Sequence, residues 1–232
     1  MQILLFDVDN TLLDFDLAEK NALCAIYEKY GIDVNDEALF VFSEVNKHLW
    51  LQNERGEIER SELFAKRFPQ VFEKLGISYD FDKNHDIDTE YRTFLSQNHA
   101  LVDGALEMLN HLQQQSAQMY IVTNGTPSVS RPRIEGAGLS NFFQDIFISE
   151  EIGANKPDKR FFDFVFSKIP PVEKKEVFII GDSLSSDILG GKNAGITTIW
   201  YNPKRQKNEQ SFSADYEIQH LMELVEILNK KS

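Results

Sequence analysis

Residues 2–13 read QILLFDVDNTLL, and this is the most informative segment of the chain. The apolar run Ile3–Phe6 is short and unbroken, which is typical of a strand buried on both faces of a parallel sheet. Asp7 stands where the strand ends, and Asp9 follows two positions later, so in extended backbone the two carboxylates project the same way. Ligand sites of open α/β sheets lie beyond the carboxyl ends of the strands. The stretch therefore indicates either acids gathered for chemistry or a turn whose acids only favour the loop.

From residue 101 onward, helical and strand patterns alternate. The strand patterns are apolar runs that helical patterns separate, and they cover residues 119–122, 146–148, 177–180 and 196–200. The last segment, 218–228, has the pattern of a closing amphipathic helix. Such alternation predicts right-handed crossovers and a parallel sheet, and therefore an α/β fold.

The block between residues 15 and 99 lacks strand patterns. Its helical patterns begin near residues 16, 35, 61 and 89, Pro69 is expected to kink or split the third helix, and residues 80–88 are expected to form a loop. We therefore predict an α/β core of residues 1–14 and 100–232, with a helical subdomain inserted after the first strand. An insertion there has the position of a lid over the edge of the sheet.

Composition limits the classes of partner. The chain has 232 residues and a formal net charge of -13, which argues against a nucleic-acid polymer or an anionic membrane as a partner. A phosphorylated substrate would be repelled at long range, so its site would need a local source of positive potential. The single cysteine, Cys24, excludes an intrachain disulfide and fits a reducing compartment. The N-terminus does not read as a signal peptide and no run is long enough to span a bilayer, so we expect a cytoplasmic protein.

Two further motifs carry groups that suit an anion. Thr123-Asn124-Gly125 follows the strand pattern 119–122, so the Thr123 hydroxyl and nearby amides could donate to phosphate oxygens, or the three residues could simply form a turn. Lys156 precedes Pro157 at the start of a helix, where the helix dipole disfavours a cation, so an anion is expected nearby. The alternative is a solvated loop lysine.

A last acidic motif follows the strand pattern 177–180. Asp182 would join Asp7 at the same edge of the sheet, and Asp187 lies in the first turn of the next helix. Clustered carboxylate oxygens favour Mg²⁺ over zinc or copper, and the five histidines are scattered without metal-ligand spacing. Each acid also has a purely structural interpretation, as a turn residue or as a helix-start residue.

Taken in order, these four motifs resemble those of the haloacid dehalogenase superfamily, and the helical insertion looks like its C1 cap. The resemblance implies a Rossmann-like parallel-sheet core. Residues 50–68, 148–153 and 181–202 look like the house-cleaning pyrimidine 5′-nucleotidase branch. Residues 130–133 depart from the family, because Pro132 is expected to break or restart a helix that the family keeps uninterrupted.

The resemblance also implies a role for each motif residue. Asp7 would be the nucleophile that forms an aspartyl-phosphate, and Asp9 the general acid and base. Mg²⁺ would be held by the Asp7 carboxylate, the Asp9 carbonyl and Asp182. Asp187 would orient the metal's waters or the lysine. The non-bridging phosphate oxygens would be held by Thr123, Asn124 and Lys156.

The resulting hypothesis is a Mg²⁺-dependent 5′-nucleotidase that hydrolyses nucleoside monophosphates, acting as a monomer or homodimer. Another small-molecule phosphatase or a sugar phosphomutase would share every core motif. A haloacid dehalogenase would need neither a metal nor an acid at Asp9, and a non-catalytic binding module would not need the full set of acids. Trp50, Arg55 and Arg92 are candidates for base recognition, with packing or surface roles as their alternative.

Overall fold

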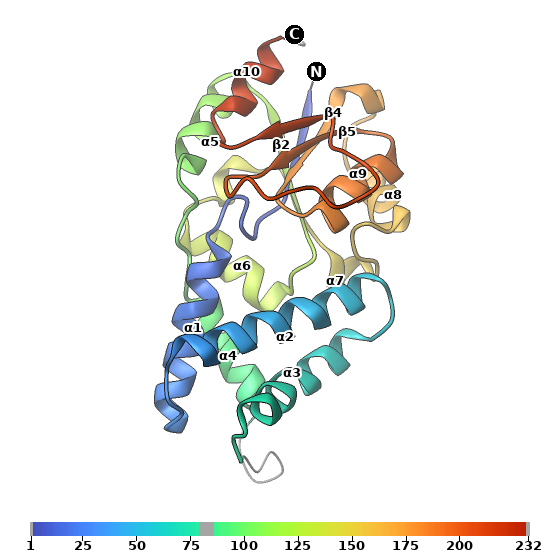
Figure 1. The fold of residues 1–232 in the computed structure, drawn as a ribbon. Coiled ribbons are helices and arrows are strands. Elements are labelled where there is room, and N and C mark those ends of the chain that lie inside the picture. The colour runs from blue at the N-terminus through green and yellow to red at the C-terminus, as the bar shows by residue number, and fades with distance from the viewer. Residues whose placement is uncertain (1, 79–85, 231–232) are drawn as a thin grey trace. The chain divides into compact units, whose positions relative to one another are not determined.

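The computed structural model describes residues 2–78 and 86–230. The chain forms two compact units, one made of Met1–Phe15 with His99–Ser232 and the other of Asp16–Asn98 (Figure 1). Among the described residues, none of the helices combines the length and the apolar character needed to cross a membrane.

A parallel sheet forms the centre of the first unit, in the strand order β3-β2-β1-β4-β5-β6. Its strands are β1 (Ile3–Phe6), β2 (Gln118–Thr123), β3 (Ile146–Ile148), β4 (Val177–Gly181), β5 (Thr197–Tyr201) and β6 (Tyr216–Ile218). The predicted α/β fold class is confirmed, and the first strand of the chain lies between β2 and β4, in the interior of the sheet.

The strand β6 corrects one prediction. Residue 218 was expected to begin the closing helix, but Ile218 ends a strand of three residues that pairs with β5. Three residues are too few to show a periodicity, and it is the pairing with β5 that defines the strand. The closing helix begins five residues later, at Glu223.

Helices cover both faces of the sheet. They are α5 (Ala105–Gln114), α6 (Pro127–Gly136), α7 (Ser149–Ile152), α8 (Lys159–Lys168), α9 (Leu189–Ala194) and α10 (Glu223–Asn229), with short turns η1 (Ser140–Phe142), η2 (Lys174–Glu176) and η3 (Leu184–Ile188). Figure 1 shows α5 and α10 on one side of the strands and α8 and α9 on the other.

The alternation of side chains along β1 builds a core on each face. Leu4 and Phe6 pack in the cluster that includes apolar residues of α5 and α10. Ile3 and Leu5 pack in a second cluster with apolar residues of α8 and α9. Successive strand residues point to opposite faces, so an unbroken apolar run is what a strand covered on both sides requires.

The helix α6 corrects a second prediction. It runs without a break from Pro127 to Gly136, although Pro132 lies inside it. Pro132 lacks an N–H and so removes one helical hydrogen bond, but Val129 and Ile134 are buried on the same helix. Packing of a buried face outweighs the local preference of a single residue.

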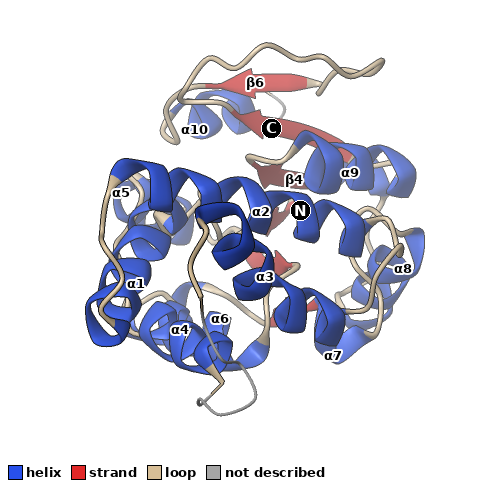
Figure 2. Ribbon diagram, turned by 60° about the horizontal axis from the view of Figure 1, so that its bottom comes forward, coloured by secondary structure: helices blue, strands red, loops and turns tan. Residues whose placement is uncertain are grey.

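The second unit contains only helices among its described residues, as the colouring in Figure 2 shows. They are α1 (Phe15–Tyr30, of which Phe15 belongs to the first unit), α2 (Asp36–Glu54), α3 (Arg60–Leu75) and α4 (Ile87–Ser96). The expected splitting of the third helix is wrong, because α3 continues through Pro69. Most of the loop expected over residues 80–88 lies outside the described residues, and α4 begins at Ile87.

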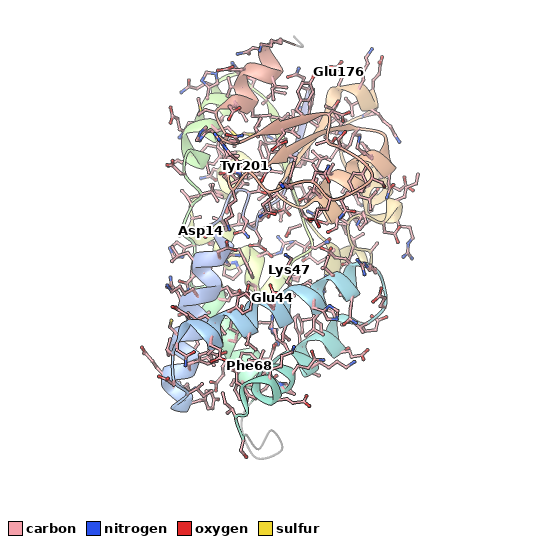
Figure 3. The ribbon with its side chains drawn as sticks, viewed as in Figure 1. Asp14, Glu44, Lys47, Phe68, Glu176 and Tyr201 are labelled. Carbon is pink, nitrogen blue, oxygen red and sulfur yellow. The ribbon has the colours of Figure 1, made fainter. Side chains whose placement is uncertain are left out.

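Aromatic rings and one arginine form the centre of the second unit. Phe68, labelled in Figure 3, is fully buried, and its ring centroid lies 5.3 Å from that of Phe42 and 5.7 Å from that of Tyr91. Arg67 is also buried, and its Nη2 donates to Asp88 Oδ1 at 2.6 Å. A buried arginine needs such a partner because an unpaired charge in the interior is costly.

Candidate active site

The register of the sheet brings the ends of three strands level. Phe6, the last residue of β1, pairs with Ile121 on one side and with Ile180 on the other. Asp7 continues this alignment, since its N–H donates to the carbonyl of Ile180 at 2.9 Å. The residues that follow β1, β2 and β4 therefore share one edge of the sheet.

Lys156 lies at this edge and is buried, with only 1% of its surface exposed. Its Nζ donates to Asp7 Oδ1 at 2.7 Å, to Asp187 Oδ1 at 2.6 Å and to the Val122 carbonyl at 2.8 Å. These contacts use all three donors of the ammonium group. The alternative of a solvated loop lysine is wrong.

Asn124 fixes the backbone that carries Lys156. The Lys156 N–H donates to Asn124 Oδ1 at 2.8 Å, and Asn124 Nδ2 donates to the Lys156 carbonyl at 2.9 Å. The neighbouring Thr123 is buried, and its Oγ1 accepts a hydrogen bond from the Gly125 N–H at 3.1 Å. The segment after β2 is thus tied both to itself and to the loop before α8.

The approach of Asp187 to the end of β4 requires a glycine. A Cβ atom at Gly181 would lie 2.2 Å from Asp187 Oδ2, closer than any real contact. Asp187 is fully buried in the π-helical turn η3, and its Oδ2 accepts a hydrogen bond from the Ser183 N–H at 3.1 Å. Asp187 is therefore a partner of Lys156 held by its own turn, and more than an acid that favours a helix start.

Asp182 is fixed through its backbone. Its N–H donates to Thr11 Oγ1 at 3.1 Å, and its carbonyl accepts a hydrogen bond from Trp200 Nε1 at 2.8 Å. The first contact ties the segment after β1 to the segment after β4, and the second ties β5 to the same point.

Three carboxylates meet at this edge, because ligand oxygens of Asp7, Asp182 and Asp187 lie within 4.8 Å of one another. Burial, with smaller contributions from Asp187 and Asp9, raises the pKa of Asp7 to about 7 against the lowering effect of Lys156. Burial, then Asp7 and then Asp187 raise the pKa of Asp182 well above its ordinary value.

Lys156 is the cation of this group. Burial would lower the pKa of its ammonium, but Asp187 and Asp7 outweigh burial and raise that pKa above its ordinary value. Lys156 balances one of the three carboxylates, so among the described residues two negative charges are left without a paired cation when all three are ionised. Oxygen ligands with this residual charge suit a hard divalent cation such as Mg²⁺.

Asp9 is not one of these three acids, although its charge helps to raise the pKa of Asp7 and of Asp182, and it faces a residue that the sequence did not single out for the site. Nη1 of Arg133 donates to Asp9 Oδ1, and the Arg133 side chain is fully buried while that of Asp9 is 33% exposed. Sequence reasoning noted the segment around Arg133 only as a departure from the family.

Thr11 and Trp200 were also missed as site residues. Thr11 stands inside the first motif and Trp200 near the end of β5, so the rule that strand ends share an edge could have suggested both.

The parallel α/β sheet gathers three carboxylates and one buried lysine at one edge. The chain that carries this site belongs to the haloacid dehalogenase-like hydrolases. Residues 4–201 match that family. The resemblance stated from the sequence is confirmed.

Individual relatives match along nearly their whole length. The HAD-hydrolase YfnB of Bacillus subtilis is 40% identical over 226 residues, covering 97% of this chain and 94% of that protein. A crystal structure of YfnB, described as bound to magnesium, superposes with a TM-score of 0.91 over 98% of both chains. The pyrimidine 5′-nucleotidase PynA of Streptococcus pneumoniae is 34% identical, covering 99% of this chain and 95% of that protein. The pyrimidine 5′-nucleotidase YjjG of Escherichia coli is 29% identical, covering 97% and 96%.

Proposed function

We propose that this protein is a Mg²⁺-dependent phosphomonoesterase whose substrates are nucleoside 5′-monophosphates. The observation that carries the proposal is the contact between Lys156 and Asp7 beside Asp182 and Asp187. It joins a carboxylate nucleophile, a buried cation and excess negative charge at one sheet edge. Phosphoryl transfer needs positioning and charge neutralisation of this kind.

The metal would be held by the carboxylates of Asp7 and Asp182 and by the carbonyl of Asp9. Asp187 is already engaged by Lys156 and by the Ser183 N–H, which suits a residue that orients the lysine. The bound ion would neutralise charge on the phosphoryl group and on Asp7. It would also make this edge of an acidic protein attractive to an anion.

The residues of the chain supply the remaining steps. Asp7 attacks phosphorus and forms an aspartyl-phosphate, while Asp9 gives a proton to the departing alcohol oxygen. Water then attacks the aspartyl-phosphate, and Asp9 takes the proton from that water. Lys156, the Thr123 hydroxyl and the amides after β2, in the segment that Asn124 holds, stabilise the non-bridging oxygens.

The substrate class is supported by the relatives, since PynA and YjjG are named as pyrimidine 5′-nucleotidases. In this proposal the helical unit is a cap that contacts the base. Of its candidate residues, Trp50 is stacked by Arg60, whose guanidinium carbon lies 5.3 Å from the ring centroid. Arg92 donates to Asp88 at 2.8 Å, so it has a packing role already, and Arg55 is largely exposed.

The proposal also covers the cellular compartment of the enzyme, its partner and its oligomeric state. A chain with one cysteine and no disulfide suits the cytoplasm. Its partner would be a small phosphate monoester, and it would act as a monomer or a homodimer.

The test is release of phosphate from a panel of about thirty phosphate monoesters with Mg²⁺. We expect the highest kcat/KM for nucleoside 5′-monophosphates, reversible loss of activity in EDTA, and no turnover by Asp7→Asn with unchanged circular dichroism. Asp163→Asn is the matched control, because it makes the same chemical change at an exposed acid that pairs with Lys159.

Three results would contradict the proposal. Full activity in EDTA would exclude the metal, and turnover by Asp7→Asn would exclude the nucleophile. A product that retains its phosphate, or a panel without phosphate release, would exclude the reaction.

A further inference from the structure

The ion pair between Arg133 and Asp9 has no role in the reaction as proposed so far. Arg133 lies on α6, eight residues after Gly125, and its guanidinium reaches a carboxylate 124 positions earlier in the chain. Arg133 is fully buried, whereas Asp9 keeps a third of its side chain exposed. The contact thus joins a charge inside the protein to a carboxylate that is partly open to solvent.

The guanidinium of Arg133 also contacts the segment that follows β1. Its central carbon lies 5.5 Å from the centroid of the Phe15 ring, a cation–π contact. The Phe15 N–H donates to Asn10 Oδ1 at 3.0 Å, and Asn10 adjoins Asp9 in the chain. Asp9 itself forms a β-bridge with Leu13. The guanidinium of Arg133 therefore contacts both ends of the segment from Asp9 to Phe15.

Close packing of α6 fixes the backbone from which Arg133 extends. A Cβ atom at Gly125 would lie 2.2 Å from Ser130 Oγ, and a Cβ atom at Gly136 would lie 3.0 Å from the ring of His99. The first turns of α6 thus pack tightly against the glycine that precedes the helix, and its last residue lies against His99. The backbone that carries Arg133 is closely packed at both ends of its helix.

A buried ion pair of this kind contributes little to the stability of the folded protein. Burying a guanidinium is costly, and an apolar side chain of similar volume usually serves a core at least as well. The placement of Arg133 is better explained by its effect on the partner carboxylate.

We propose that Arg133 is a positioning residue that holds Asp9 by Oδ1 and so presents Oδ2 to the reacting oxygen. The proposal rests on the proposed function, in which Asp9 is the acid and base. In the first step the proton on Oδ2 passes to the ester oxygen as the phosphorus–oxygen ester bond breaks and a bond from Asp7 to phosphorus forms. In the second step the water oxygen forms a bond to phosphorus as the bond between phosphorus and the Asp7 carboxylate oxygen breaks, and a proton of that water passes to Oδ2. Neither transfer disturbs the contact at Oδ1.

The experiment compares two phosphate esters that differ in their need for a proton. A nucleoside 5′-monophosphate releases an alcohol and requires protonation, whereas p-nitrophenyl phosphate releases a stable phenolate. The measured quantity is kcat/KM with Mg²⁺, since it reports on phosphoryl transfer to Asp7. The variants are Arg133→Met, Arg133→Lys, Asp9→Asn and the double variant of Asp9→Asn with Arg133→Met.

We expect Arg133→Met to lose about a hundredfold or more on the nucleotide and less than about tenfold on the aryl ester, because general acid catalysis contributes about 10²–10⁴-fold. Asp9→Asn should show the same selectivity, and the double variant should lose no more than Asp9→Asn alone. Arg133→Lys should recover part of the loss. Arg131→Met is the control on the same helix, because Arg131 pairs with Glu151 at the surface, and both its rates should stay within about twofold of wild type.

The positioning role would be overturned if folded Arg133→Met lost kcat/KM equally on the two esters, or lost none on either. Both results would leave the proposed function intact. If that variant fails to fold, Phe15→Leu and Arg133→Lys give the same comparison, and equal losses there would also overturn the positioning role. A wild-type enzyme inactive on both esters would refute the proposed function itself, and the positioning role with it.

Discussion

Replacing Asp182 by asparagine should stabilise the protein while removing its response to magnesium. Asp182 lies within 4.8 Å of two other carboxylates and at an edge where Lys156 balances only one of them. At an effective dielectric constant of about 20, two like charges this close repel by about 3 kcal/mol or more. Asparagine keeps the shape and removes the charge.

The expected gain is smaller than the full repulsion. The pKa of Asp182 is raised, so uptake of a proton already relieves part of the strain in the wild type. We expect about 2 kcal/mol in EDTA near neutral pH, which for a chain of this size corresponds to roughly 4–8 °C in Tm. Asp163→Asn, at the surface, should change Tm by less than about 1 °C.

The sign of the pH dependence follows from the same carboxylates. The folded pKa of Asp7 is about 7, above its unfolded value of 3.8, so the folded state binds more protons between these values and loses stability as pH rises through them. In EDTA the wild-type Tm should therefore fall from about pH 4 to about pH 7, and it should fall less for Asp182→Asn.

Thermal unfolding followed by circular dichroism, in EDTA and in Mg²⁺, measures these Tm values and does not depend on enzyme activity. Mg²⁺ should raise the wild-type Tm strongly at about pH 8 and weakly at about pH 5, because ligands must be deprotonated to bind. It should leave the Tm of Asp182→Asn nearly unchanged. An Asp182→Asn protein that is less stable than wild type in EDTA, or that gains as much from Mg²⁺, would refute the reasoning.

Two further substitutions test the supporting structure. Gly181→Ala puts a methyl group 2.2 Å from Asp187 Oδ2, so the Asp187 carboxylate must shift from its position beside Lys156. We expect the rate of phosphate release to fall roughly 10–100-fold with the fold retained. A wild-type rate would contradict this packing. Arg67→Met leaves buried Asp88 without its main partner. Urea unfolding should show that the free energy of unfolding falls by about 3–5 kcal/mol. A decrease below about 1 kcal/mol would show that the pair does not stabilise the helical unit.

Much of the fold was predictable because its signals are local. The apolar run that ends at Asp7 predicted a strand covered on both faces, and the alternation after residue 101 predicted the parallel sheet. The strand β6 and the unbroken α6 were not predictable in this way. One is defined by its neighbour in the sheet, and the other is a case where packing outweighs Pro132.

The chemical groups at the ends of the strands can be read from local sequence patterns alone. Side chains alternate along a strand and parallel strands end at a common edge, so Asp7, Thr123 and Asp182 were expected to approach one another. How the charges pair became known only from the folded chain. Lys156 is buried between Asp7 and Asp187, and Arg133 holds Asp9 from a helix that the sequence suggested was broken. Which cation meets which carboxylate depends on how helices pack on the sheet, and no local periodicity in a sequence records that.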